Sequence, residues 1–127
     1  MIDLLLLLPE KLVRATAMVS SMHLLVERVT REFLQGKCTI SAISMVKAYN
    51  SRLGREVISL CRECLGGNGI VLDYGIASKF CDMESIYTYE GTYDVYTLVC
   101  GRDLLGVSAI KSAASVKNSL RKRQSKL

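Results

Sequence analysis

Glu90 is the residue whose sequence surroundings best suit acid–base chemistry. It lies in the stretch Tyr87-Thr88-Tyr89-Glu90-Gly91-Thr92-Tyr93-Asp94, which sets one carboxylate among aromatic residues. A carboxylate buried among aromatic rings is a better base near neutral pH, and Gly91 would let a ligand approach the backbone closely. Alternatively, Glu90 occupies a turn before a helix whose first turn favours acidic residues. The spacing alone leaves both interpretations open.

Three other patterns have simpler explanations. Cys61 and Cys64 form a C-x-x-C pair, but a metal or redox site needs a second ligand pair or a thioredoxin-like context. We therefore predict that both thiols belong to a helix face and that the chain has no metal site. The segment Gly66-Gly67-Asn68-Gly69 lacks the preceding strand and following lysine of phosphate-binding loops, which favours a helix end and a tight turn. The single histidine, His23, is predicted to be structural.

Two long helices must position these segments. A first helix is predicted over Pro9–Gln35, with Pro9 in its first turn and Gly36 just past its end. It carries a heptad seam of apolar residues that requires a partner helix: Leu12, Ala15, Val19, Met22, Val26, Val29 and Phe33. A second helix with the same spacing is predicted to open at Thr39 or Ser41 and to stop at Leu65–Gly69.

Shorter elements follow the glycine-rich turn. We predict a short helix over Gly75–Met83, an extended or irregular stretch at Ile86–Tyr89, and a further helix capped by Thr92 or Asp94. No segment shows a strong two-residue period, so the fold class is all-α, a helical bundle.

Composition narrows the possible functions. The chain has 127 residues, of which 50% are hydrophobic and 23% are charged, which suits one globular domain. Six basic and no acidic residues fall in 111–127, whereas the remainder carries 11 basic and 12 acidic groups. The net charge of +5 therefore belongs to a tail, and we expect no nucleic-acid-binding fold. The apolar run Leu4–Leu8 is too short for a membrane span, and five cysteines without a secretory signal suggest reduced thiols in an intracellular protein.

Residues 111–127 are expected to form a flexible, solvated tail. The sequence ends in Ser125-Lys126-Leu127, the address that a peroxisomal import receptor reads. We therefore expect a peroxisomal protein, although three residues can also match by chance. A further interpretation makes this basic tail an arm for a membrane surface or a nucleic acid.

Three motifs together resemble the C-terminal helical domain of the acyl-CoA dehydrogenase and oxidase superfamily. They are Cys64-Leu65-Gly66-Gly67-Asn68-Gly69, then Ile86 to Asp94, then Gly101-Arg102. The likeness is greatest to the plant peroxisomal short-chain acyl-CoA oxidases, which are close to glutaryl-CoA dehydrogenase. It covers about residues 9–110, after an atypical start at 1–8, and leaves 111–127 as the tail. The superfamily's N-terminal helical domain, its middle β-domain and the first helix of the C-terminal domain are not in this sequence, so we expect a truncated, incomplete bundle.

The resemblance implies a function and residue roles. Glu90 is implied to be the base that removes the α-proton of an acyl-CoA while a hydride leaves the β-carbon for FAD, giving a trans-2-enoyl-CoA. In oxidases the electrons then reduce oxygen to hydrogen peroxide. Gly91 is implied to lie against the substrate, and Thr92 and Asp94 near FAD. The segment implied to contact the FAD of a neighbouring subunit, which makes homo-oligomerisation part of cofactor binding, comprises Glu63, Cys64, Leu65, Gly66 and Gly67.

Two details depart from the superfamily pattern. Many relatives have glutamine at the position of Glu63, and near relatives have phenylalanine at the position of Ile110. The alternative to an enzyme is a non-catalytic module that pairs through the seam from Leu12 to Phe33 with full-length oxidase subunits or with itself.

Overall fold

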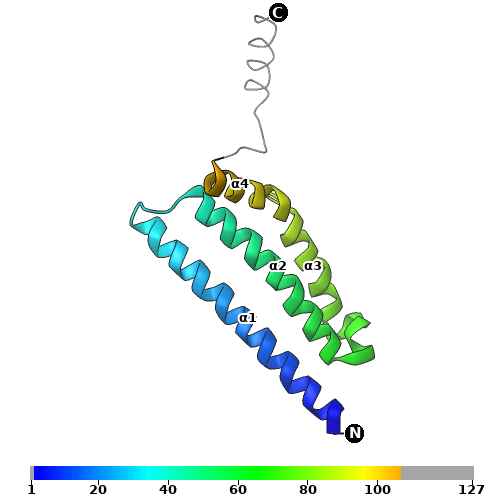
Figure 1. The fold of residues 1–127 in the computed structure, drawn as a ribbon. Helices are drawn as coiled ribbons and strands as arrows, with labels where there is room; N and C mark the ends of the chain where they lie inside the picture. The colour runs from blue at the N-terminus through cyan, green and yellow to red at the C-terminus, as the bar shows by residue number, and fades with distance from the viewer. Residues whose placement is uncertain (1, 107–127) are drawn as a thin grey trace, which may run out of the picture.

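The computed structural model describes residues 2–106, which form four α-helices and two short 3₁₀ segments (Figure 1). They are α1 (Ile2–Leu34), α2 (Ile40–Cys64), η1 (Gly66–Ile70), η2 (Leu72–Tyr74), α3 (Ile76–Thr88) and α4 (Tyr93–Leu105). No strand occurs within this range, and the all-α prediction is confirmed. The predicted tail, the tripeptide Ser125-Lys126-Leu127 and Ile110 lie outside the described residues.

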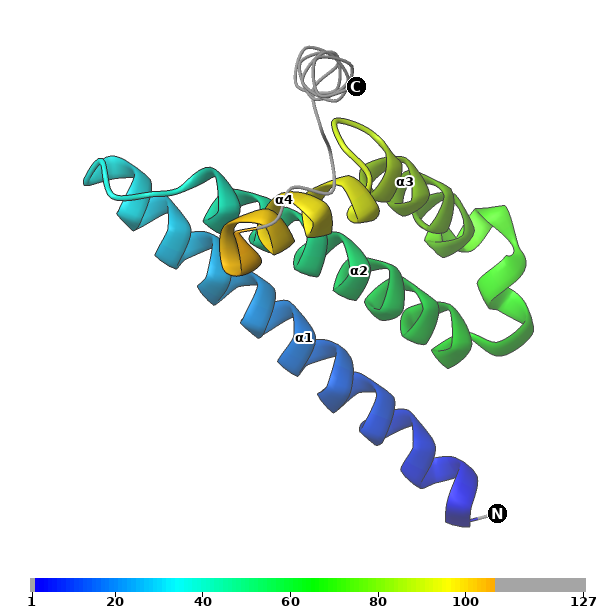
Figure 2. The same cartoon turned by 45° about the horizontal axis from the view of Figure 1, so that its top comes forward.

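Helix α2 is the centre of the bundle. Helix α1 runs antiparallel along one side of it, and α3 and α4 pack on the other side (Figures 1 and 2). The buried residues follow this arrangement, because nearly all of them belong to α2: Ser44, Val46, Ala48, Ser51 and Leu60, with Ala15 from α1. These side chains are mostly small, and few residues are fully buried, so the core is thin.

Helix α1 begins seven residues before the predicted start, at Ile2. Pro9 therefore lies inside the helix and not in its first turn, which corrects the prediction. A proline removes one backbone donor, but the leucine run before it favours the helix, so the helix continues through it. The other end is as predicted: α1 ends at Leu34, and Gly36 follows with a φ of +68°.

The apolar seam of α1 is covered on one side only. Ala15 is buried, and Met22 and Val29 are half-buried. The intervening residues Leu12, Val19, Val26 and Phe33, spaced seven apart, keep exposed fractions of 50%, 49%, 47% and 65%. We call these four residues the exposed row. Only half of the predicted seam therefore finds its partner in α2.

The helix ends are set by individual side chains. Thr39, one of the two predicted caps of α2, accepts a hydrogen bond at 3.1 Å from the backbone N–H of Ala42. Thr92, one of the two predicted caps of α4, accepts one at 3.4 Å from Val95. Helix α3 continues to Thr88, so the prediction of an irregular stretch from Ile86 was wrong. The cause is tertiary: the ammonium of Lys47 in α2 binds the carbonyls of Ile86 and Tyr89 and so caps the last turn.

Candidate functional site

The glycine-rich turn ends α2 and depends on two of its glycines for different reasons. Gly66 has a φ of +56°, a left-handed conformation that glycine adopts without strain. Gly69 is buried, and a Cβ there would lie 2.2 Å from the carbonyl oxygen of Arg62. Around Gly66 and Gly67 a Cβ would meet nothing within 4 Å. The backbone of these two residues is therefore open to an approaching group.

Glu63, the acidic residue of the predicted FAD-contacting segment, is paired with Lys11 of α1. The Lys11 Nζ lies 2.6 Å from the Glu63 Oε2. This hydrogen bond and the charge of Lys11 hold the pKa of Glu63 below its ordinary value of 4.5. Lys11, Glu63, Cys64 and Gly66 line a hollow of about 320 Å³. Because Lys11 offsets the charge of Glu63, the pair has no net charge beside the open backbone of Gly66 and Gly67, and the carboxylate does not by itself repel an anionic ligand there.

Glu90 lies in the turn between α3 and α4, where the backbone takes an unusual conformation. Its φ is +54°, and that of Gly91 is +108°. The Tyr96 hydroxyl donates a 2.7 Å hydrogen bond to the Glu90 carbonyl. The Glu90 side chain is exposed, and its carboxylate has no hydrogen bond or ion pair with residues 2–106. Within the described residues, the carboxylate is therefore not buried among the aromatic rings, and it is free to act on a ligand.

The aromatic residues around Glu90 pair with each other and with cations of α2. The rings of Tyr87 and Tyr93 stack with centroids 5.9 Å apart. The Arg55 guanidinium lies 4.3 Å from the centroid of Tyr87 and binds Glu84 at 2.6 Å. These contacts fix the flanks of the turn and leave the Glu90 side chain outside the stack.

The sequence analysis missed two residues of this region, Lys47 and Arg55. Lys47 Nζ lies 4.8 Å from the centroid of Tyr89. Neither cation occupies a position of the apolar seam of α2, but the two are eight residues apart and therefore lie on neighbouring parts of one side of the helix. Two cations on one side of a helix, in a chain with an aromatic-rich segment, could have predicted these contacts, since cations favour the faces of aromatic rings.

Thr92 and Asp94 begin α4. The Thr92 side chain caps the helix, and Asp94 is exposed in its first turn, where an acid suits the helix dipole. Thr92 is therefore the cap of α4, and Glu90 lies in the turn that precedes this helix. Gly91, between them, is half-buried beside Tyr96.

One copy of the chain does not bring the two predicted segments together. Residues 63–67 precede α3, and Glu90 follows it (Figure 1). Helix α3 has 13 residues, so its ends are about 20 Å apart. Any cofactor contact made by Glu63–Gly67 therefore falls well away from the Glu90 of the same copy.

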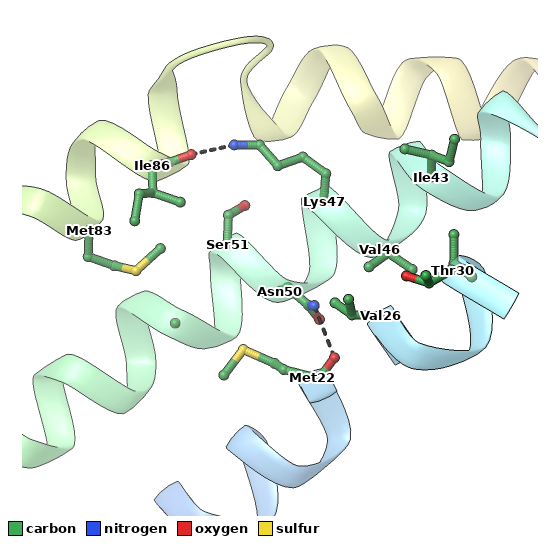
Figure 3. Close-up of a pocket in the computed structure, with 12 residues that line it drawn as sticks. Met22, Val26, Thr30, Ile43, Val46, Lys47, Asn50, Ser51, Met83 and Ile86 are labelled. Atoms are coloured by element: carbon green, nitrogen blue, oxygen red, sulfur yellow. Dashed lines mark hydrogen bonds between the residues drawn. The ribbon is translucent and has the colours of Figure 1, made fainter. Parts of the chain in front are cut away.

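An apolar trough of about 520 Å³ lies between α1, α2 and α3 (Figure 3). Met22 and Val26 of α1 form one wall and Met83 and Ile86 of α3 the other, and Gly54 of α2 is among the lining residues. The Asn50 amide donates to the Met22 carbonyl at 3.2 Å, whereas its Oδ1 is buried without a partner within residues 2–106. A second, separate hollow of about 500 Å³ lies between the same helices and is lined by Leu12, Cys61, Cys64 and the start of α3.

The remaining residues of interest are dispersed. All five thiols are free, and His23 is exposed on α1. Within residues 2–106, no group of His, Cys, Asp or Glu side chains is arranged to hold a metal ion. None of the helices described is both long and apolar enough to cross a bilayer.

Comparisons with known proteins agree on one family. The profile described as "Acyl-CoA dehydrogenase, C-terminal domain" matches residues 7–105. A curated relative, the acyl-coenzyme A oxidase-like protein of Mus musculus, is 30% identical over an 80-residue alignment that covers 58% of this chain and 13% of that protein. The crystal structure of glutaryl-CoA dehydrogenase from Mycobacterium smegmatis superposes with a TM-score of 0.77 at 31% identity. That match covers 81% of this chain and 27% of the dehydrogenase, so the chain spans only a small part of these relatives.

Proposed function

Because this chain belongs to the family of acyl-CoA dehydrogenase C-terminal domains, we propose that it supplies the catalytic base of a peroxisomal, FAD-dependent acyl-CoA oxidase. The observation that carries the proposal is the turn at Glu90. An exposed carboxylate without a partner in residues 2–106 stands on a backbone held from within the bundle. A carboxylate placed in that way is able to take a proton from a ligand that docks against Gly91.

The proposed role of Glu90 is to remove the α-proton of an acyl-CoA thioester, leaving a trans-2-enoyl-CoA. The thioester carbonyl acidifies this proton, so an ordinary carboxylate suffices as the base. The chemistry supplied by bound FAD is acceptance of the β-hydride and transfer of the electrons to oxygen, which yields hydrogen peroxide. Thr92 and Asp94 would contact FAD, and the exposed backbone of residues 63–67 would contact the FAD of a neighbouring subunit.

The first test measures flavin binding and turnover by the 127-residue chain. After incubation with FAD and desalting, visible absorbance that remains with the protein would support the proposal, as would formation of enoyl-CoA and hydrogen peroxide from butyryl-CoA. Glu90→Gln is expected to lower turnover about 100-fold or more, since a general base contributes roughly that much. Glu56→Gln, at an exposed glutamate of α2, is the matched control and is expected to keep full turnover. A chain that retains no flavin and forms no product contradicts the proposal.

The second candidate is a non-catalytic module that pairs with related oxidase subunits or with itself. The exposed row favours it, because four large side chains at heptad spacing are about half exposed or more. Two of them, Leu12 and Val26, also line the hollows between α1 and α3. A partner helix that lies along this surface would complete the half-covered seam.

Size-exclusion chromatography with light scattering tests this second candidate. Val19→Asp and Val26→Asp place charges in the exposed row and are expected to weaken self-association or co-purification with a full-length oxidase. Ser20→Asp adds the same charge at an exposed position outside the row and is the control. Equal effects of all three substitutions would contradict a specific interface.

Peroxisomal import is part of the first proposal and has its own test. A fluorescent protein fused before Met1 is expected to reach peroxisomes only when Ser125-Lys126-Leu127 is intact. Import that survives removal of these three residues contradicts the targeting role, and membrane or nucleic-acid binding that disappears on removing 111–127 would favour the basic-arm interpretation.

A further inference from the structure

The backbone at Glu90 needs external support. Glu90 is the single non-glycine residue with a positive φ in residues 2–106, and its φ is +54°. A side-chain-bearing residue in this conformation is strained by about 1–2 kcal/mol. Such a conformation persists only where surrounding contacts fix it. In this turn, the contacts that can do so are the hydrogen bonds to its backbone carbonyls.

Tyr96 holds the turn from the side of α4. Its hydroxyl donates to the Glu90 carbonyl at 2.7 Å. Its ring also lies against Gly91, where a Cβ would come within 2.8 Å of the ring carbon Cε2. One side chain therefore contacts both residues of the turn whose φ is positive.

Lys47 holds the turn from the side of α2. Its ammonium donates to the carbonyl of Ile86, as Figure 3 shows, and to that of Tyr89 at 3.4 Å. The same ammonium lies 4.8 Å from the centroid of the Tyr89 ring. The peptide preceding Glu90 is thereby tied to Lys47 of α2, which lies 42 residues before Tyr89 in the sequence.

We propose that Lys47 and Tyr96 are positioning residues that together hold Glu90 in its left-handed conformation and so direct its carboxylate outward. The two side chains bind the carbonyls of consecutive residues, Tyr89 and Glu90, from two different helices. Each acts through the backbone, and neither is assigned a contact with the substrate. The proposal rests on the proposed role of Glu90 as the base, but its geometry is testable without turnover.

The test uses NMR of the full 127-residue chain, with the three-bond HN–Hα coupling and carbon shifts of Glu90 as the signature of its φ. Tyr96→Phe and Lys47→Met are expected to move these signals toward ordinary φ values. Lys47→Arg is expected to retain the wild-type signature, since a guanidinium also donates to carbonyls. The controls are Tyr93→Phe, a neighbouring tyrosine that stacks on Tyr87, and Lys37→Met in the exposed α1–α2 loop.

A glutamyl endopeptidase provides a second readout in the same samples. Cleavage after Glu90 is expected to become about 3- to 10-fold faster in Tyr96→Phe, because loss of one hydrogen bond increases the open population by about that factor. Cleavage after Glu56, inside α2, reports global unfolding and is expected to stay far slower than cleavage after Glu90 and to rise by no more than the same factor, because the lost bond weakens the native state against both open forms. Wild-type signals and cleavage in both Tyr96→Phe and Lys47→Met would overturn the proposal. If Glu90→Gln leaves turnover unchanged while Tyr96→Phe and Lys47→Met still change the NMR signals of Glu90, then Glu90 is not the base, but the positioning contacts are confirmed.

Discussion

Three glycines of the turn after α2 are expected to respond differently to the same substitution. In Gly69→Ala, the new Cβ would lie 2.2 Å from the Arg62 carbonyl oxygen and 3.0 Å from its carbon. Both atoms belong to the backbone of the last turn of α2, so they yield only if the helix end moves. Gly66→Ala meets no atom within 4 Å but keeps a φ of +56°. Gly67→Ala meets neither obstacle.

The geometry sets the expected magnitudes. Overpacking typically costs about 1–3 kcal/mol, and a backbone clash this close belongs at the upper end. Alanine also reduces the entropy of the unfolded chain, which returns about 0.4–1 kcal/mol. The net loss expected for Gly69→Ala is therefore about 2–3 kcal/mol. Gly66→Ala is expected to lose about 1 kcal/mol from its left-handed backbone, and Gly67→Ala to gain about 0.5 kcal/mol.

Urea unfolding followed by circular dichroism measures these differences. With a slope of about 1–3 kcal/mol per molar urea, the midpoint of Gly69→Ala is expected to fall by about 1–2 M. Gly67→Ala serves as the matched control because it has the same chemistry two residues away. Equal midpoints for Gly69→Ala and Gly67→Ala would falsify the close approach of Gly69 to the end of α2.

Three further outcomes follow from contacts elsewhere in the bundle. Thr39→Ala is expected to cost about 1 kcal/mol in urea unfolding, and more than Thr92→Ala, because the cap bond of Thr39 is 3.1 Å long and that of Thr92 is 3.4 Å; a reversed order contradicts this. Gly54→Ala is expected to change the unfolding free energy by less than about 1 kcal/mol, since its Cβ meets only the flexible Met83 side chain, at 2.8 Å. Gly54→Val is expected to cost about 2 kcal/mol by separating α2 from α3, and equal thermal midpoints for the two variants would refute this. Lys11→Met is expected to raise the pKa of Glu63 toward 4.5 in a carboxyl-carbon NMR titration. Because that pKa is lowered in the folded state, the pair stabilises the fold above pH 4.5 and loses this effect as pH falls through the folded pKa; a titration that Lys11→Met leaves unchanged contradicts the ion pair.

The spacing of apolar residues predicted the long helices well. It did not predict where a helix ends when that end is bound by a residue distant in the sequence. The seven-residue spacing along α1 and the Thr39 cap of α2 are local signals, and both are present in the structure. The end of α3 is different, because Lys47 extends it from another helix. No pattern within residues 76–90 contains that contact.

At the candidate site, too, local features were predictable from the sequence and contacts between helices were not. The turn at Glu90 was identifiable from its glycine and the following cap residue, whereas the exposure of its side chain was not. The aromatic residues suggested burial, but Tyr87 and Tyr93 stack on each other, and Arg55 pairs with Tyr87. Which rings pair depends on cations in α2, and sequence spacing does not reveal which side chains across a bundle meet.

The attachment of α1 has a consequence for assembly. This helix packs along α2 and reaches it through a short loop that contains the left-handed Gly36. The α2 of another copy offers the same contacts, so α1 can exchange between chains with no loss of packing. The balance between closed monomers and domain-swapped dimers then depends on protein concentration relative to the effective concentration that the loop imposes. Raising the chain concentration should therefore shift this protein toward exchanged pairs, in which one chain's α1 lies on its partner's α2.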